Sequence, residues 1–179
     1  MIEKAQLTDT KTLRARARQQ IEQGAVIAAH RGDRERVLNL LNGALATEIV
    51  CGLRYRRHYF MADGINRKPV SQEFLEHAAE EQAHADAIAG RIVELGGAPN
   101  FSPDGLAGRS HSEYVEGGTL LEMIKEDLVA ERIAIDSYTE IIRYIGDDDP
   151  TTRRLLEGIL AVEEEHAENL SSLLEGVRR

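Results

Sequence analysis

Four stretches of this sequence repeat apolar residues at alternating steps of three and four, the period of one helix face, and this pattern leaves few folds open. The stretches run from Arg36 to Asp63, from Ser71 to Gly96, from Thr119 to Gly146 and from Asp149 onward. Thr119 and Glu122 match a capping box, and Asp149-Pro150 places a cap before a proline, so both later helices have a defined start. The connections are short, long and short. We therefore predict an all-α four-helix bundle made of two antiparallel hairpins and one long crossover connection.

The composition agrees with this architecture and excludes several classes of function. Of 179 residues, 42% are hydrophobic and 4% aromatic, with no Trp, which favours helices over sheets. The net charge of −9 argues against nucleic-acid binding by the chain as a whole, and the single cysteine, Cys51, excludes a disulfide framework or a four-cysteine zinc site. Because the sequence has no long apolar run and no apolar segment within residues 1–20, we expect a cytoplasmic protein without membrane contact.

The chain divides into two segments. Residues 1–34 are polar, with seven basic and four acidic side chains, and we interpret them as an N-terminal arm with room for one short helix. Residues 35–176 carry the four helical patterns, and we interpret them as the bundle domain.

Acidic and imidazole side chains interrupt all four apolar helix faces. The residues that stand where Leu or Ile would be expected are Glu48, Glu81, His84, Glu131, Glu163 and His166. Glu48 and Glu81 are 33 residues apart, and Glu131 and Glu163 are 32 apart, so the two acids of each hairpin lie at similar heights. Two such hairpins packed face to face bring four carboxylates and two imidazoles to one level of the core.

This cluster requires positive charge. A buried carboxylate without a partner costs several kcal/mol or takes up a proton. The nearby cationic residues, Arg54 among them, fall outside the apolar faces, so we expect two divalent cations to balance the four carboxylates. Oxygen and imidazole ligands suit iron or manganese, and zinc would bind without redox chemistry. One E-x-x-H pair would fit a solvated helix face, but two pairs at matched spacing favour a site for two metal ions per chain.

With these motifs in place, residues 37–170 resemble the bacterioferritin-like proteins of the ferritin-like dimetal-carboxylate superfamily. The motifs that carry the resemblance are Glu48 with Tyr55, Glu81-x-x-His84, the stretch 91–100, Asp127 to Glu131, and Glu163-x-x-His166. The resemblance implies the ferritin-like bundle, with Glu48 and Glu131 as terminal ligands and Glu81 and Glu163 bridging two irons. It implies that His84 and His166 each bind one iron. The implied activity is that of a ferroxidase, which oxidises Fe²⁺ with dioxygen or peroxide for iron storage or detoxification.

Two departures from the family pattern change what is expected. Haem-binding bacterioferritins carry an axial Met after the Glu of the first E-x-x-H, and this chain has Gln82 there, so we expect no haem. Only 13 residues follow His166, too few for the fifth helix of 24-subunit cages. We therefore expect a homo-oligomer between a dimer and a shell, with a twelve-subunit shell favoured over 24 subunits.

Several further residues are candidates for supporting roles. Tyr55 and Tyr138 could hydrogen-bond the ligand carboxylates or donate an electron, although a buried Tyr is also an ordinary core residue. Asp127 lies one turn before Glu131 and is a candidate acceptor for a ligand imidazole. His77 lies one turn before Glu81 and could be an entry group or support a ligand, although a partly exposed position is the simpler expectation for it. Glu76, Glu80 and Glu164 flank the ligands and could guide iron inward, although a solvated acidic face is the simpler expectation for them.

Two alternatives to the ferroxidase remain open from the sequence. The same ligands would serve a peroxide-scavenging or oxygen-activating oxidoreductase with iron or manganese. A shell that protects DNA, like the Dps proteins, would use the basic residues of the arm, but the net charge of −9 argues against DNA as a partner.

Overall fold

The computed structural model describes residues 7–19, 21–23, 33–64 and 67–177, and every regular element in these ranges is a helix. The elements are α1 (Thr10–Gln19), the short 3₁₀ helix η1 (Ile21–Gln23), α2 (Arg34–Met61), α3 (Arg67–Glu94), the single turn α4 (Leu106–Arg109), α5 (Leu120–Ile145) and α6 (Pro150–Val177). Helix α1 lies within the predicted arm and has no buried residue. The four long helices are those that the apolar periodicity predicts.

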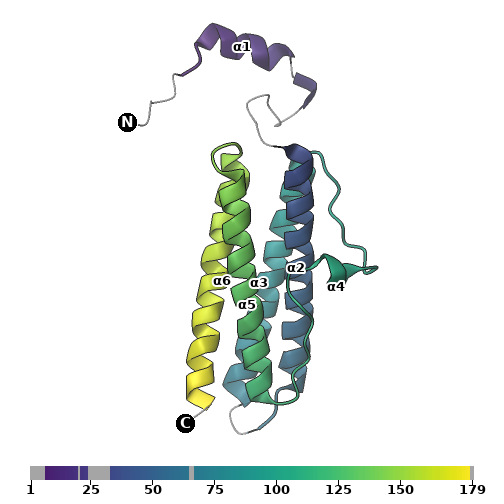
Figure 1. Ribbon diagram of the computed structural model, residues 1–179, viewed down its shortest axis with the longest axis vertical. Helices are drawn as coiled ribbons and strands as arrows, with labels where there is room; N and C mark the ends of the chain where they lie inside the picture. Colours follow the sequence, from purple (N-terminus) through teal and green to yellow (C-terminus); the bar gives the residue numbers. More distant parts are fainter. Residues whose placement is uncertain (1–6, 20, 24–32, 65–66, 178–179) are drawn as a thin grey trace.

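The long helices form two antiparallel hairpins that lie side by side (Figure 1). Helix α2 packs along α3, α5 packs along α6, and the contacts of α2 with α5 and of α3 with α6 join the two hairpins. The long connection between α3 and α5 runs along the outside of the bundle and contains α4 (Figure 1). This is the predicted ferritin-like bundle with one crossover.

The helix ends follow the sequence signals with one exception. The Thr119 hydroxyl accepts a hydrogen bond from the Glu122 amide, and the Glu122 carboxylate accepts one from the Thr119 amide, so the predicted capping box is confirmed. Helix α3 begins at Arg67, before the expected start near Ser71. Pro69 lies in the first turn of α3, where a missing amide hydrogen costs nothing, and it therefore does not delay the helix.

The core consists of two apolar clusters. One contains Leu41, Ile88, Ile92, Ile141 and Leu156, among others, and the second contains Tyr55, Phe74, Met123, Ile124 and Leu170. Along each long helix, the acidic and imidazole residues of the predicted site come between the residues of these two clusters. The polar layer is thus enclosed by apolar packing on both sides.

None of the helices in the described ranges combines the length and the apolar content that a membrane crossing requires.

Candidate metal centre

The structure brings all six predicted ligands together in the interior. Helix α2 contributes Glu48, α3 contributes Glu81 and His84, α5 contributes Glu131, and α6 contributes Glu163 and His166. The four glutamates are at most 1% exposed, and the least buried member, His84, is 9% exposed. Four ionisable carboxylates are therefore buried at one level of a helix bundle.

The six side chains divide into two overlapping groups, each compact enough to surround one cation. Glu48, Glu81, His84 and Glu163 offer ligand atoms that all lie within 4.8 Å of one another. Glu81, Glu131, Glu163 and His166 form a second group by the same measure. Glu81 and Glu163 belong to both groups, whereas each of the other four residues belongs to one.

Both imidazoles present Nδ1 to the carboxylates. Nδ1 of His84 lies 2.9 Å from Oε1 of Glu163 and 3.2 Å from Oε2 of Glu48. Nδ1 of His166 lies 3.4 Å from Oε2 of Glu163, 3.5 Å from Oε1 of Glu81 and 4.0 Å from Oε2 of Glu131. Each imidazole thus directs one nitrogen into its own group.

The hydrogen bonding of this cluster is incomplete. Among the described residues, buried atoms without a hydrogen-bond partner include both carboxylate oxygens of Glu163, one each of Glu81 and Glu131, and Nδ1 of His166. The contacts of Glu163 with the two imidazoles are thus ion-pair contacts and not hydrogen bonds. Buried polar atoms in folded proteins are nearly always paired, and an unpaired one costs free energy. Oxygen and imidazole nitrogen atoms with no partner, converging at metal-ligand spacing, fit a pair of divalent cations.

The electrostatics of the metal-free cluster agree with this fit. Burial and the neighbouring charge of Glu163 raise the pKa of Glu48, and burial and the surrounding carboxylates raise the pKa values of Glu81 and Glu131 well above the usual range. Although burial opposes it, contacts with His166 and His84 lower the pKa of Glu163 to about 2. Burial also disfavours the charged form of His84, but its contacts with Glu163 and Glu48 raise the pKa of His84 to about 10. Without cations, the cluster therefore holds protons in their place.

The two candidate tyrosines contact the two glutamates that belong to only one group. The Tyr55 hydroxyl donates a hydrogen bond to Oε1 of Glu131, and the Tyr138 hydroxyl donates one to Oε1 of Glu48. Each bond joins a helix of one hairpin to a helix of the other. Burial and the nearby carboxylates raise the pKa values of both phenols well above their usual range, so both hydroxyls remain donors.

Asp127 does not contact a ligand imidazole, contrary to the prediction. Its carboxylate accepts a hydrogen bond from Nε of Arg54 at 2.8 Å, and its other oxygen lies 2.8 Å from Nδ1 of His58. Arg54, expected outside the apolar faces, is only 1% exposed. The reason is that the side chains of Arg54 and His58 on α2 point toward Asp127 on α5, one turn before Glu131. The carboxylate of Asp127 neutralises the buried guanidinium of Arg54. This pair lies beside the carboxylate cluster, so among the described residues the guanidinium of Arg54 is paired with Asp127 and the basic partners of the four glutamates are His84 and His166.

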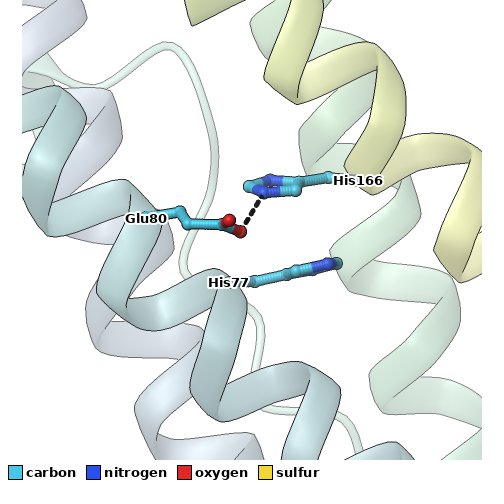
Figure 2. Close-up of side chains that lie close together, drawn as sticks. All are labelled: His77, Glu80 and His166. Carbon is cyan, nitrogen blue, oxygen red and sulfur yellow. Dashed lines mark hydrogen bonds and ion pairs between the residues drawn. The ribbon is translucent and has the colours of Figure 1, made fainter.

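The sequence did not reveal that Glu80 and His77 both contact His166. Oε2 of Glu80 lies 2.8 Å from Nε2 of His166 (Figure 2). His77, predicted to be partly exposed, is only 2% exposed and stacks on His166, with ring centroids 3.9 Å apart and planes at 20°. The position of His77 in the apolar face of α3, between Phe74 and Glu81, was the available signal for its burial.

One ligand can be reached from a pocket. A cavity of about 240 Å³ between α2 and α3 is lined by Glu48, Gly52, Arg56 and Gln82, among others. Glu48 is the one predicted ligand among the residues that line this cavity, and Gln82 lines it as well.

Comparison with known proteins agrees with the fold and with the motifs. The family described as a ferritin-like domain matches residues 38–179. A bacterioferritin of Mycobacterium avium is 34% identical over 145 residues, covering 80% of this chain and 86% of the relative. A protein of Pyrococcus furiosus named "DNA protection during starvation protein" is 33% identical, covering 80% of each chain.

Solved structures show the same architecture. The bacterioferritin-related protein of Bacteroides fragilis, described as a dodecameric thioferritin, superimposes with a TM-score of 0.79 at 33% identity, covering 82% of this chain and 89% of that one. Dps from Thermosynechococcus elongatus superimposes with a TM-score of 0.75 at 22% identity, which shows a shared fold. The family match and the relatives above 30% identity place this chain in the ferritin-like diiron superfamily, where it is similar to the bacterioferritins.

Proposed function

We propose that this chain is a ferroxidase that takes up two Fe²⁺ ions in the six-residue centre and oxidises them to Fe³⁺ for iron storage or detoxification. The observation that carries the proposal is the overlap of the two ligand groups at Glu81 and Glu163. Two residues that belong to both groups can hold two cations close enough to deliver electrons to one oxidant. Two independent metal sites would not need shared ligands.

The chain's own residues would supply ligands, orientation and a closed environment. Hard carboxylate oxygens favour Fe³⁺ over Fe²⁺, and a bound iron pair supplies the two electrons that an oxidant accepts. Tyr55 and Tyr138 hold the carboxylates of Glu131 and Glu48 in fixed orientations. Glu80 accepts a hydrogen bond from Nε2 of His166, which leaves the Nδ1 lone pair free for a cation. The apolar clusters on both sides limit the access of water.

The test compares two neighbouring glutamates of α6. Glu163→Ala removes a ligand shared by both groups, and we expect rapid aerobic Fe²⁺ oxidation to be lost while the helical content and oligomeric size stay unchanged. Glu164→Ala is the matched control, because Glu164 is exposed and belongs to neither ligand group. Stopped-flow absorbance of the ferric product measures both. Equal oxidation rates in Glu163→Ala and the wild-type chain would refute the proposed ferroxidase.

We further propose that the chain assembles as a homo-oligomer. Large apolar side chains are exposed on several helices, among them Leu53 (51%), Phe60 (76%) and Met61 (52%) on α2. Leu53 and Phe60 are seven residues apart and therefore lie on one face of α2, and a continuous exposed apolar face is typical of a surface that another subunit covers. The relative from Bacteroides fragilis, described as dodecameric, supports a twelve-subunit shell. Native mass spectrometry should give a mass of twelve chains, and a monomer would refute the proposed assembly.

A further inference from the structure

A second cluster of possible metal ligands lies next to the centre, where α3 and α6 meet (Figure 2). His77 and Glu80 of α3 and His166 of α6 offer three ligand atoms that lie within 4.8 Å of one another. Two imidazole nitrogens and one carboxylate oxygen are donors that Fe²⁺, Co²⁺ and Zn²⁺ all accept. Of the three residues, only His166 also belongs to a ligand group of the centre.

The buried imidazole of His77 is incompletely paired. Its side chain is almost wholly buried, and Nδ1 has no hydrogen-bond partner among the described residues. Its other nitrogen, Nε2, lies 3.4 Å from Oε1 of Glu73. Stacking on His166 accounts for the packing of the ring but leaves the lone nitrogen unexplained, since an apolar side chain could stack equally well. A cation is a partner that the lone pair of a neutral imidazole nitrogen can accept.

The carboxylate of Glu80 connects this cluster to solvent. Glu80 is 52% exposed, while its Oε2 reaches the buried ring of His166. Glu73 and Glu76 lie on the same helix within two turns of Glu80 and add negative charge to the approach. A hydrated cation can therefore meet Glu80 at the surface before it contacts either imidazole.

We propose that His77, Glu80 and Nε2 of His166 form a loading site, which binds a divalent cation briefly before the cation moves into the adjacent centre. The proposal rests on the proposed function, because it needs the centre as the destination. A neutral imidazole has one lone pair, so His166 can bind a cation through Nε2 or through Nδ1, but not through both. The loading site and the second ligand group therefore compete for His166, and a cation in the loading site must leave it for His166 to serve the centre.

The experiment measures how fast Co²⁺ reaches the centre and how much binds at equilibrium. The full-length oligomer, freed of metal, is mixed with less than one Co²⁺ per chain, and stopped-flow visible absorbance follows binding. A separate equilibrium dialysis against excess Co²⁺ gives the number of ions bound per chain. His77→Phe keeps a ring that can stack on His166 but has no ligand atom, and Glu80→Gln keeps a hydrogen-bond acceptor for His166 but is a weaker ligand. Glu76→Gln is the control, since Glu76 is an exposed acid of α3 outside the cluster.

We expect His77→Phe and Glu80→Gln to load Co²⁺ about tenfold more slowly than wild type. His77→Phe should still bind two ions per chain at equilibrium, because His77 is outside both ligand groups of the centre. Glu76→Gln should load at the wild-type rate. Wild-type rates in both His77→Phe and Glu80→Gln would overturn the loading site and leave the centre standing. If Glu76→Gln loads Co²⁺ as slowly as the other two variants, the effect is due to surface charge. If His77→Phe binds fewer Co²⁺ ions per chain at equilibrium than wild type, the effect is due to damage at the centre. Either result overturns the proposal. If the wild-type chain itself binds no Co²⁺ in its interior, both the proposed function and the loading site are wrong.

Discussion

Glu163 differs from the other three glutamates of the centre because it lies between two imidazoles. Contacts with His84 and His166 keep it ionised despite burial, whereas burial and mutual repulsion raise the pKa values of Glu48, Glu81 and Glu131. In the metal-free cluster, the raised pKa values therefore favour protonation of the other three glutamates. The same residues become charge partners for cations once these protons leave.

Metal binding should therefore release protons. At pH 7 the metal-free chain holds a proton on His84, whose pKa is about 10, and a cation must displace it. Burial and the neighbouring carboxylates raise the pKa values of Glu81 and Glu131, so these groups keep their protons to higher pH than a free glutamate does. Glu163, with a pKa of about 2, contributes no proton. Because protons compete with cations, the affinity for Co²⁺ should fall as the pH is lowered from 7 to 5. Calorimetry in two buffers of different ionisation enthalpy measures the release, and identical heats in the two buffers would contradict this prediction.

The four long helices were predictable because each has a repeating apolar face and the two later ones also have capping signals. The six ligands were predictable because they interrupt those faces. The partners around the ligands were not. The pairing of Glu80 with His166, and of Arg54 with Asp127, depends on which helices are neighbours and how they are rotated. Glu80 lies in an exposed part of α3, where a carboxylate usually contacts only water, and no spacing within one helix reveals a partner on another.

The buried pair of Arg54 and Asp127 also fixes the crossover connection. Arg54 donates to the Glu113 carbonyl at 2.8 Å, and His58, on the other oxygen of Asp127, lies 2.9 Å from the Glu116 carbonyl. Asp127 therefore joins α5 to α2, and α2 in turn contacts the backbone of the connection. Because this connection precedes α5, its attachment supports the position of Glu131 one turn further along that helix.

Asp127→Asn should therefore destabilise the fold. The substitution leaves the buried guanidinium of Arg54 without its counter-charge, and breaking such a pair costs about 3–5 kcal/mol. We expect a lower thermal midpoint and faster hydrogen exchange in residues 112–118. Asp136→Asn, an exposed position on the same helix, is the matched control. A midpoint shift in Asp127→Asn no larger than that of Asp136→Asn would show that the network does not stabilise the crossover.

At the scale of the whole molecule, charge is distributed unevenly between the arm and the bundle. Residues 35–179 carry 27 acidic and 15 basic side chains, a net charge of −12, whereas residues 1–34 carry a net charge of +3. Within the arm, α1 has four exposed cations, Lys11, Arg14, Arg16 and Arg18, and no acidic residue. An acidic bundle attracts Fe²⁺ and repels polyanions, so the two segments would act oppositely on nucleic acid.

We expect repulsion by the bundle to prevail and the intact chain not to bind DNA, even though a relative is named for DNA protection. Phosphate binding grows with the number of neutralising cations, and one ten-residue helix offers four against a bundle of net charge −12. A gel-shift assay with duplex DNA at low salt measures this, with the chain lacking residues 1–33 as the control. Both proteins should leave the DNA unshifted. The opposite outcome is a gel shift that the intact chain produces, the shortened chain does not produce, and added salt reverses. It would mean that the cations of α1 overcome the negative charge of the bundle, and it would favour a DNA-protecting shell.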